Sequence, residues 1–326
     1  MREGRGTGIE GLEAWDLGLE ARRLQLRHWS SGRRHSAIVI RAFSSFAIRN
    51  FPPIPAVLTL TLLTPGSLPI DLTGITPSWA RDKTLSEIER HSIRQGNRPL
   101  PIAELFRVGG DPADNRLQIS GNLRSVHRIG AKLDSGAIEV EGTAGRRLGA
   151  EMSGGTITVH GDVGDWAGCQ MQAGTIRVHG DAGDYLGSAY AGSTRGMRGG
   201  TLLVDGAAGR EAAHCMRRGL IAVAGSLGPM AAMDMLAGTL VVLGNIGIRP
   251  GAGMRRGTIL SAHRPERILP TFRHAGSTRP VIVRMLLLHL QRSGFKIPAE
   301  LLDSNYDLYH GDGVSLGRGE LLAATG

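Results

Sequence analysis

Two adjoining stretches of the chain, GTITVHGDVGDWAGCQMQA at 155–173 and GTIRVHGDAGDYLGSAY at 174–190, open in the same way. The same spacing recurs on both sides of them, with opening glycines at 136, 155, 174, 200, 219, 238 and 257. Successive units are 19 residues long, except that the unit from 174 carries seven extra residues within 188–196. A fixed period of this length is typical of a repeat protein, in which each repeat is one structural unit.

Each unit begins with an alternating apolar pattern that predicts a β-strand. Ile or Leu stands two residues after the opening glycine, and Val stands four residues after it in six units. Side chains two residues apart share one face of a strand, so these residues should face inward. A Gly-x-x-Gly corner follows, where glycine tolerates positive φ. The corner encloses a small apolar residue, which is Ala144, Val163, Ala182, Ala208, Leu227 or Ile246.

One unit cannot bury its apolar side alone, but units stacked about 4.8 Å apart bury a continuous core. A methionine near the end of each unit should pack against the neighbouring units. We therefore predict a mainly β fold: a single-stranded, right-handed β-helix of about seven 19-residue turns. The open ends of such a stack expose unpaired strand edges, so small α/β caps are expected at both ends.

The predicted organisation has four segments. Residues 1–56 are Arg-rich and are expected to be a disordered extension or a mis-assigned start. Residues 57–115 form the N-terminal cap, with a strand at 57–63 and a helix that a capping box opens at Thr84 and that runs to about 93. The β-helix itself occupies 116–260. Residues 261–326 form a C-terminal helix and cap, in which an apolar helix at 281–291 packs against another surface and 311–322 docks back.

Composition and charge exclude several classes of protein. Forty-eight glycines with 4% aromatic residues suit many recurring tight turns. The net charge of +9 favours anionic partners, but no basic and aromatic stacking platform accompanies it, so nucleic acid is not expected. No run approaches the roughly 18 apolar residues of a membrane span. Two cysteines outside any CxxC pair indicate neither a disulfide framework nor a zinc motif, and they favour the cytoplasm.

The repeat Gly-x-(Ile/Leu)-x-Val-x-Gly-x-x-Gly, with its closing Gly/Ala-x-x-Met, resembles the β-helix domain that ends the large subunit of glutamate synthase. It is more similar to the C subunit of formylmethanofuran dehydrogenase and of its bacterial relative, the formyltransferase/hydrolase complex. The flanks QGNRPLPIAELF at 95–106, RIGAKL at 128–133 and HGDGVSLGRGELL at 310–322 also carry this resemblance. It covers about 57–326.

The resemblance implies a non-catalytic structural subunit of an enzyme complex in one-carbon metabolism. Its partners would be a metal-dependent hydrolase, a formyltransferase and a third subunit. In the bacterial version, formaldehyde is oxidised to formate by way of tetrahydromethanopterin and a methanofuran-type coenzyme. The archaeal version adds a molybdenum or tungsten enzyme. We therefore expect no catalytic residue, bound cofactor or metal on this chain.

Two alternatives remain open at this point. A glutamate-synthase-like spacer subunit would need amidotransferase and flavin-binding partners. A stand-alone β-helix enzyme would be a polysaccharide lyase or an acyltransferase. The acyltransferase repeat gives a turn of 18 residues, and a lyase would need long irregular loops around a side groove.

Two sets of side chains are candidate binding sites. The outward column Glu141, His160, His179 and Asp205 could share a zinc ion, although a solvated polar ladder is the favoured interpretation. Paired arginines recur two turns apart and could attract the acidic tail of a furan coenzyme or an acidic partner, with Arg195 and Arg198 nearby; solvated surface charge is again favoured. These pairs are Arg217, Arg218, Arg255 and Arg256.

Aromatic and sulfur side chains complete the candidates. Trp166 and Tyr185 occupy one column and are predicted to stack at a surface or a protein interface. Cys169 and Cys215 are predicted to be small buried apolar residues rather than reactive thiols.

Overall fold

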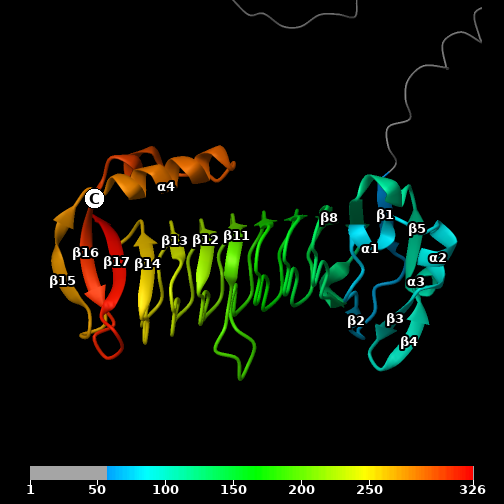
Figure 1. Ribbon diagram of the computed structural model, residues 1–326, viewed down its shortest axis with the longest axis horizontal. Coiled ribbons are helices and arrows are strands. Elements are labelled where there is room, and N and C mark those ends of the chain that lie inside the picture. The colour runs from blue at the N-terminus through cyan, green and yellow to red at the C-terminus, as the bar shows by residue number, and fades with distance from the viewer. Residues whose placement is uncertain (1–56, 326) are drawn as a thin grey trace, which may run out of the picture. The chain divides into compact units, whose positions relative to one another are not determined.

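The computed structural model describes residues 57–325, and the predicted extension 1–56 lies outside them. The chain winds into a stack of parallel strands, which stand side by side along the long axis in Figure 1. Each strand pairs in parallel with the next, which bears out a mainly β solenoid. The stack runs in the order β1 (Leu58–Leu62), β6 (Arg116–Ser120), β8 (Ala137–Glu141), β9 (Thr156–Val159), β10 (Thr175–Val178), β11 (Arg198–Val204), β12 (Arg218–Val223), β13 (Thr239–Val242), β14 (Arg256–Ser261) and β17 (Arg318–Thr325).

The interior of the solenoid is built from columns of identical or similar side chains. Ile157 pairs with Ile176, and Val159 pairs with Val178, so each residue type stacks on its equivalent one unit away. These residues are fully buried. The small corner residues also stack through isolated parallel bridges, as predicted for Ala144, Val163, Ala182, Ala208, Leu227 and Ile246. Each 19-residue unit, called a coil below, therefore contributes the same inward side chains.

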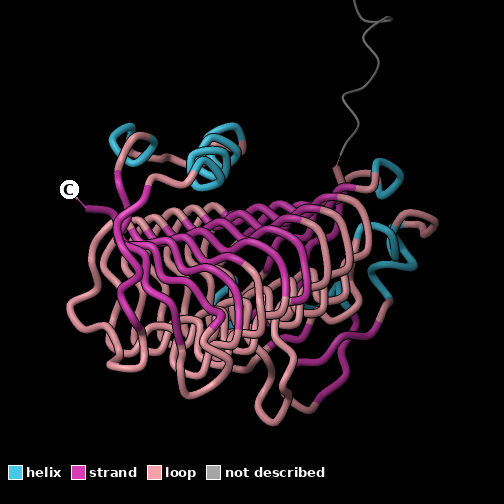
Figure 2. Tube along the Cα trace, turned by 60° about the vertical axis from the view of Figure 1, so that its left-hand side comes forward, coloured by secondary structure: helices cyan, strands magenta, loops and turns pink. Residues whose placement is uncertain are grey.

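Beyond the Gly-x-x-Gly corner, each coil adopts a backbone conformation that the sequence did not predict. In the coil from 136, Arg147, Gly149 and Glu151 all have φ near +60°. Leu148 between them belongs to the solenoid core, whereas Ala150 packs in an outer cluster against which Trp166 and Tyr190 also pack. The amides of Arg147 and Glu151 donate to the next coil, whereas that of Gly149 donates to the previous one. This alternation satisfies the backbone groups on both sides of a coil. Figure 2 shows how regularly the coils stack.

The closing methionines lie inside the stack. All six, from Met152 to Met254, are fully buried. A Cβ atom on the opening glycine Gly200 would lie 2.6 Å from Cε of Met171 and 2.8 Å from the carbonyl oxygen of Gly174. The repeating glycine therefore leaves the space that the methionine of a neighbouring coil fills.

The N-terminal cap closes one end of the stack. Strand β5 (Phe106–Gly109) runs antiparallel to β1, which confirms the predicted strand at 57–63. A second sheet has the order β4-β3-β2-β7. Its strands are β4 (Arg98–Pro101), β3 (Ser92–Gln95), β2 (Ile70–Asp71) and β7 (Val126–His127). The short helices of this end are α1 (Pro77–Ala80), α2 (Leu85–Arg90), α3 (Ile102–Leu105), η2 (Pro112–Asp114) and η3 (Leu123–Ser125).

Helix α2 begins as predicted but ends earlier. The Thr84 side chain accepts from the Glu87 amide, and the Glu87 carboxylate accepts from the Thr84 amide, so the capping box is present. The predicted end near 93 is wrong, because Ile93 belongs to β3 and pairs with Leu100 of β4. The pairing of β3 with β4, which directly follow the helix, therefore overrides its local continuation.

The C-terminal segment closes the other end and covers part of the outer surface. Strands β15 (Arg273–Thr278) and β16 (Asn305–Gly311) run antiparallel beside β17, which pairs in parallel with β14, so 311–322 docks back as predicted. Helix α4 (Val281–Arg292) lies over the outside of the stacked strands in Figure 1, and η4 (Ala299–Leu302) comes between α4 and β16 in the chain. The inner face of α4 packs on the outward column Leu203, Ala222, Val241 and Leu260.

The predicted packing of α4 against another surface is confirmed on one face of the helix. Val283, Leu287 and Leu290 are buried against the sheet. On the opposite face, Val281 and Met285 are 73% and 60% exposed in this chain. In the part of the chain that the structure describes, no helix is long and apolar enough to cross a membrane.

Candidate functional site

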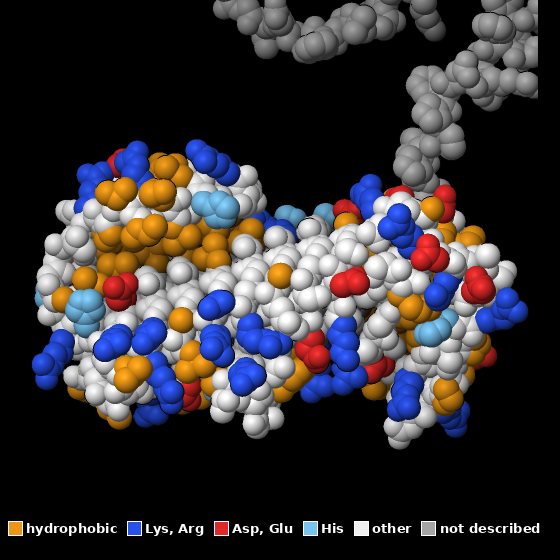
Figure 3. Space-filling model, in the orientation of Figure 1, with side chains coloured by type: hydrophobic (Ala, Val, Ile, Leu, Met, Phe, Trp, Pro, Cys, Tyr) orange, Lys and Arg blue, Asp and Glu red, His pale blue; other side chains and the backbone are white. Residues whose placement is uncertain are grey.

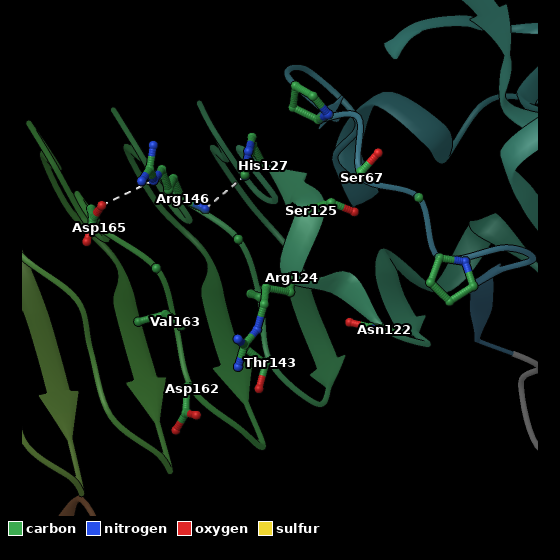
Figure 4. A pocket seen from close by; sticks show the side chains of 16 residues that line it. Ser67, Asn122, Arg124, Ser125, His127, Thr143, Arg146, Asp162, Val163 and Asp165 are labelled. Carbon is green, nitrogen blue, oxygen red and sulfur yellow. Dashed lines mark hydrogen bonds and ion pairs between the residues drawn. The ribbon is translucent and has the colours of Figure 1, made fainter. Parts of the chain in front are cut away.

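A groove lies between the N-terminal cap and the corners of the first coils. Its largest cavity, about 720 Å³, is drawn in Figure 4. Arg146, Asp162 and Asp165 come from the coil corners, and Ser67 and Arg124 come from the cap side. Two further cavities, of about 370 and 540 Å³, continue the groove. The cavity of about 720 Å³ shares Pro69, His127 and Arg146 with the cavity of about 370 Å³. The latter shares Arg128, Arg147 and Trp166 with the cavity of about 540 Å³.

Most polar groups in this groove are held by neighbours. Arg146 Nε lies 3.1 Å from Asp165 Oδ2, and Arg128 forms an ion pair with Asp71. His127 Nδ1 accepts a hydrogen bond of 3.0 Å from the Arg146 amide, so its proton is on Nε2 in the neutral ring. Burial, and next the Arg146 charge, lower the pKa of His127 below its usual value. The groove therefore presents guanidinium groups that are already paired with carboxylates, and an imidazole whose Nδ1 is already engaged.

An aromatic stack continues the groove along the coils. Trp166 and Tyr185 stack at 4.6 Å with an angle of 9° between their planes, as the column predicted. The Arg147 guanidinium lies 5.7 Å from the Trp166 ring and 5.4 Å from the ring of Tyr190, and Arg210 lies 5.5 Å from Tyr185. Tyr190 belongs to the seven-residue insertion. The insertion thus folds back on the earlier coils, a contact that repeat spacing cannot reveal.

The two cysteines are buried, as predicted. Burial raises the pKa of Cys169 to about 11 and also raises the pKa of Cys215. The thiolate is the reactive form of cysteine, so both thiols are poor nucleophiles near neutral pH.

Only one pair of the predicted metal ladder, His179 with Asp205, is hydrogen-bonded; His160 pairs instead with Glu139, outside the ladder. His160 Nε2 lies 2.9 Å from Glu139 Oε1 and 4.0 Å from Glu141 Oε1. His179 Nδ1 lies 2.8 Å from Asp205 Oδ2, and the two imidazole rings are 5.4 Å apart. The ligand atoms of Glu139, Glu141 and His160 lie within 4.8 Å of one another, close enough for one ion.

Glu139 was missed in the sequence because it stands two residues before Glu141, outside the column that was considered. The hydrogen bond between Glu139 and His160 satisfies both groups without an ion. A chain free of metal therefore remains our prediction.

The paired arginines come together as predicted. Arg217, Arg218, Arg255 and Arg256 surround a cavity of about 460 Å³ with Leu236, Ala237 and Leu316. All four arginines are exposed. Leu316 was not predicted, because it comes from the loop between β16 and β17, far away in the sequence.

Sequence comparisons place these features among known proteins. One stretch is 36% identical over 75 residues to the C subunit of the molybdenum-containing formylmethanofuran dehydrogenase 1 of Methanosarcina barkeri, covering 22% of this chain and 25% of that one. Another is 41% identical over 88 residues to the C subunit of the formyltransferase/hydrolase complex Fhc of Methylorubrum extorquens, covering 26% and 33%. The aligned stretches thus span about a quarter to a third of these curated relatives.

A structural comparison extends over much more of the chain. A chain in the crystal structure of the formyltransferase/hydrolase complex (FhcABCD) from Methylorubrum extorquens, in complex with methylofuran, matches with a TM-score of 0.77 and 39% identity. The match covers 82% of this chain and 100% of that one. The stacked coils define the class of GXGXG solenoids, and residues 118–268 match the GXGXG motif family model. Within this class, the chain belongs to the family formed by the C subunits of formylmethanofuran dehydrogenases and formyltransferase/hydrolase complexes. The resemblance inferred from the sequence is confirmed.

Proposed function

We propose that this chain is a non-catalytic structural subunit of a formyltransferase/hydrolase complex. The complex would act in the oxidation of formaldehyde to formate by way of tetrahydromethanopterin and a methanofuran-type coenzyme, and its own steps would be formyl transfer and hydrolysis to formate. The observation that carries this proposal is the match to a chain of such a complex along that chain's whole length. A likeness confined to the repeat would support only the fold.

The expected partners are a metal-dependent hydrolase, a formyltransferase and a third subunit. We assign the furan coenzyme and the metal to those partners. The solenoid would supply a long side whose shape is fixed by stacked coils, against which the partners are positioned. The two free cysteines suit the reducing cytoplasm as the place of action. We further infer a right-handed winding of about seven coils.

The pairing of the polar groups supports a non-catalytic role. His160 and His179 each hydrogen-bond to a carboxylate on the outer face of the sheet, and His127 accepts from a backbone amide. Both thiols have raised pKa values. His160 and His179 line none of the cavities described above. Acid–base or nucleophilic catalysis needs a group within reach of a bound substrate.

Activity assays on the separated components test this role. The purified full chain should neither transfer a formyl group between tetrahydromethanopterin and a furan coenzyme nor release formate. The same assays on the complex should show both activities. Turnover by the chain alone, at a rate comparable with that of the complex, would refute the non-catalytic role.

A further inference from the structure

A basic hollow with an apolar floor lies where successive coils meet. We call it the arginine pocket: Arg217, Arg218, Leu236, Ala237, Arg255, Arg256 and Leu316. The repeat explains its composition, because the two residues after the closing methionine occupy the same place in every coil. In three successive coils these pairs are Arg-Arg, Leu-Ala and Arg-Arg. The apolar pair is therefore flanked by guanidinium groups from the coils on either side.

The arginine column continues beyond the pocket in both directions. Arg198 of β11 is in register with Arg218 of β12, and Arg256 of β14 is in register with Arg318 of β17. Adjacent strands lie about 4.8 Å apart, so the four steps from β11 to β17 span about 19 Å. Figure 3 shows basic side chains in a row across the solenoid, below the apolar surface beside α4. An extended ligand along the solenoid axis would meet a cation in most coils.

These arginines lack the partners that other arginines of the solenoid have. Arg146, Arg177 and Arg210 each form an ion pair with an aspartate. Within residues 57–325, the four arginines of the pocket form no ion pair and no side-chain hydrogen bond. Arg198 Nε is buried without a hydrogen-bond partner in the same part of the chain. Several uncompensated cations close together repel one another and favour an anionic ligand.

The apolar floor narrows the choice of ligand. Leu316 is 55% exposed, and the neighbouring Val314 is 78% exposed. Large exposed apolar side chains at a rim of arginines resemble the composition of protein interfaces, where arginine is enriched and apolar residues form the centre. A small inorganic anion would leave this floor uncovered. A ligand that fits the whole pocket has an apolar group with carboxylates on either side.

We propose that the arginine pocket binds an extended segment of a partner subunit in which an apolar side chain is flanked by aspartates or glutamates. The apolar side chain would cover Leu236, Ala237 and Leu316, and the carboxylates would pair with the arginines. An extended chain advances about 3.3 Å per residue, so about six residues match the column of about 19 Å. Arginine binds carboxylates through two parallel hydrogen bonds, which fixes the segment as well as attracting it. This inference rests on the proposed function.

Cross-linking in the assembled complex tests the identity of the ligand. A photo-reactive amino acid replaces Leu236 in the full chain, and the complex is purified from its host and irradiated. The cross-linked peptide should come from a partner subunit and carry at least two carboxylates beside an apolar residue. A peptide without carboxylates, an adduct to a non-peptide anion, or an assembled complex without any cross-link would overturn the proposal.

Charge reversal tests whether the pocket contributes to binding. Arg217→Glu with Arg255→Glu should lower recovery of the partner at about 0.15 M salt at least tenfold, and partner release from the unmodified chain should increase with salt. The matched control is Arg107→Glu with Arg273→Glu, which changes net charge equally at exposed arginines of β5 and β15 and should change recovery less than twofold. Equal recovery with both double variants would overturn the proposal.

Melting temperatures separate loss of binding from loss of folding. The pocket variant should melt no lower than the unmodified chain, because it relieves repulsion between cations. If it unfolds instead, the cross-link at Leu236 decides the proposal. If the unmodified chain recovers no partner, the proposed function and this inference fail together. If the complex assembles and only the pocket experiments fail, the proposed function stands.

Discussion

Gly200 illustrates how the stack limits a single residue. Its φ is +89°, and an added Cβ would lie within 2.8 Å of both Met171 and the Gly174 backbone. We predict that Gly200→Ala lowers the free energy of unfolding by about 2–3 kcal/mol, from backbone strain and overpacking together. Urea unfolding measures the loss.

Gly192, in the insertion, is the matched control. Its φ is +82°, but no atom lies within 4 Å of the position of an added Cβ. Gly192→Ala should cost about 1 kcal/mol, the strain of a left-handed alanine alone. Equal losses for the two variants would show that the methionine packing contributes nothing.

Because the thiol of Cys169 is buried, we predict that the free energy of unfolding depends on pH. Burial raises the pKa of its thiol from 9.0 to about 11, so between these values the unfolded chain loses the proton while the folded chain keeps it. Its contribution to stability is complete below pH 9.0 and is lost as pH rises towards 11, at about 1.4 kcal/mol per pH unit.

The comparison with Cys169→Ala isolates this effect, because other groups also ionise in this range. The unmodified chain should lose stability more steeply than the variant between pH 9.0 and about 11, as measured by urea unfolding at each pH. Parallel curves for the two proteins would contradict a protonated, buried thiol.

At single positions, the sequence predicts what the repeat makes periodic. The inward Ile and Val columns, the corner residues and the methionines were all identified correctly. The left-handed residues Arg147 and Glu151 were missed, because their side chains do not favour that conformation and hydrogen bonds to both neighbouring coils impose it. Glu139 was missed because the pairing of histidine side chains across strands depends on rotamers, which the spacing does not encode.

One face of helix α4 is buried against the sheet, and the opposite face is exposed. Leu287 is fully buried against the sheet, whereas Met285 is 60% exposed. We predict that Leu287→Ala lowers the free energy of unfolding by about 2–4 kcal/mol, the usual cost of a cavity in a core. Met285→Ala should change it by about 0.5 kcal/mol or less. Thermal and urea unfolding measure both variants, and similar losses would mean that α4 is not packed as described.

The pairing of the two histidines that directly follow β9 and β10 predicts how the chain responds to metal. Because His160 and His179 already hydrogen-bond to Glu139 and Asp205, the purified chain should contain zinc far below one equivalent after dialysis against micromolar zinc. Elemental analysis measures the content. Stoichiometric zinc that disappears in Glu139→Gln would overturn the expectation and establish a metal site on this face.

For helices and strands, local sequence signals predicted where an element begins better than where it ends or which strand it pairs with. The capping box at Thr84 located the start of α2, but the pairing of Ile93 with Leu100 decided its end. The apolar pattern of α4 predicted a buried face. The sequence could not show that Arg318 extends the arginine column, because the register between β14 and β17 joins segments that are far apart along the chain.

Across the whole molecule, the described residues form a continuous stack closed by antiparallel strands at both ends, with β5 at one end and β15 and β16 at the other. Closing the ends protects edges that would otherwise pair with other chains. Open surfaces then lie along the sides: the cap groove, the arginine pocket and the outer face of α4. Such a molecule is suited to holding partners at several places along one solenoid.

We expect this chain to work inside a formyltransferase/hydrolase complex. Affinity purification of the tagged full chain from its native host, followed by mass spectrometry of the proteins that accompany it, tests this role. We predict a formyltransferase and a metal-dependent hydrolase in near-stoichiometric amounts. Recovery of the chain by itself, or with amidotransferase and flavin-binding subunits, would contradict the account.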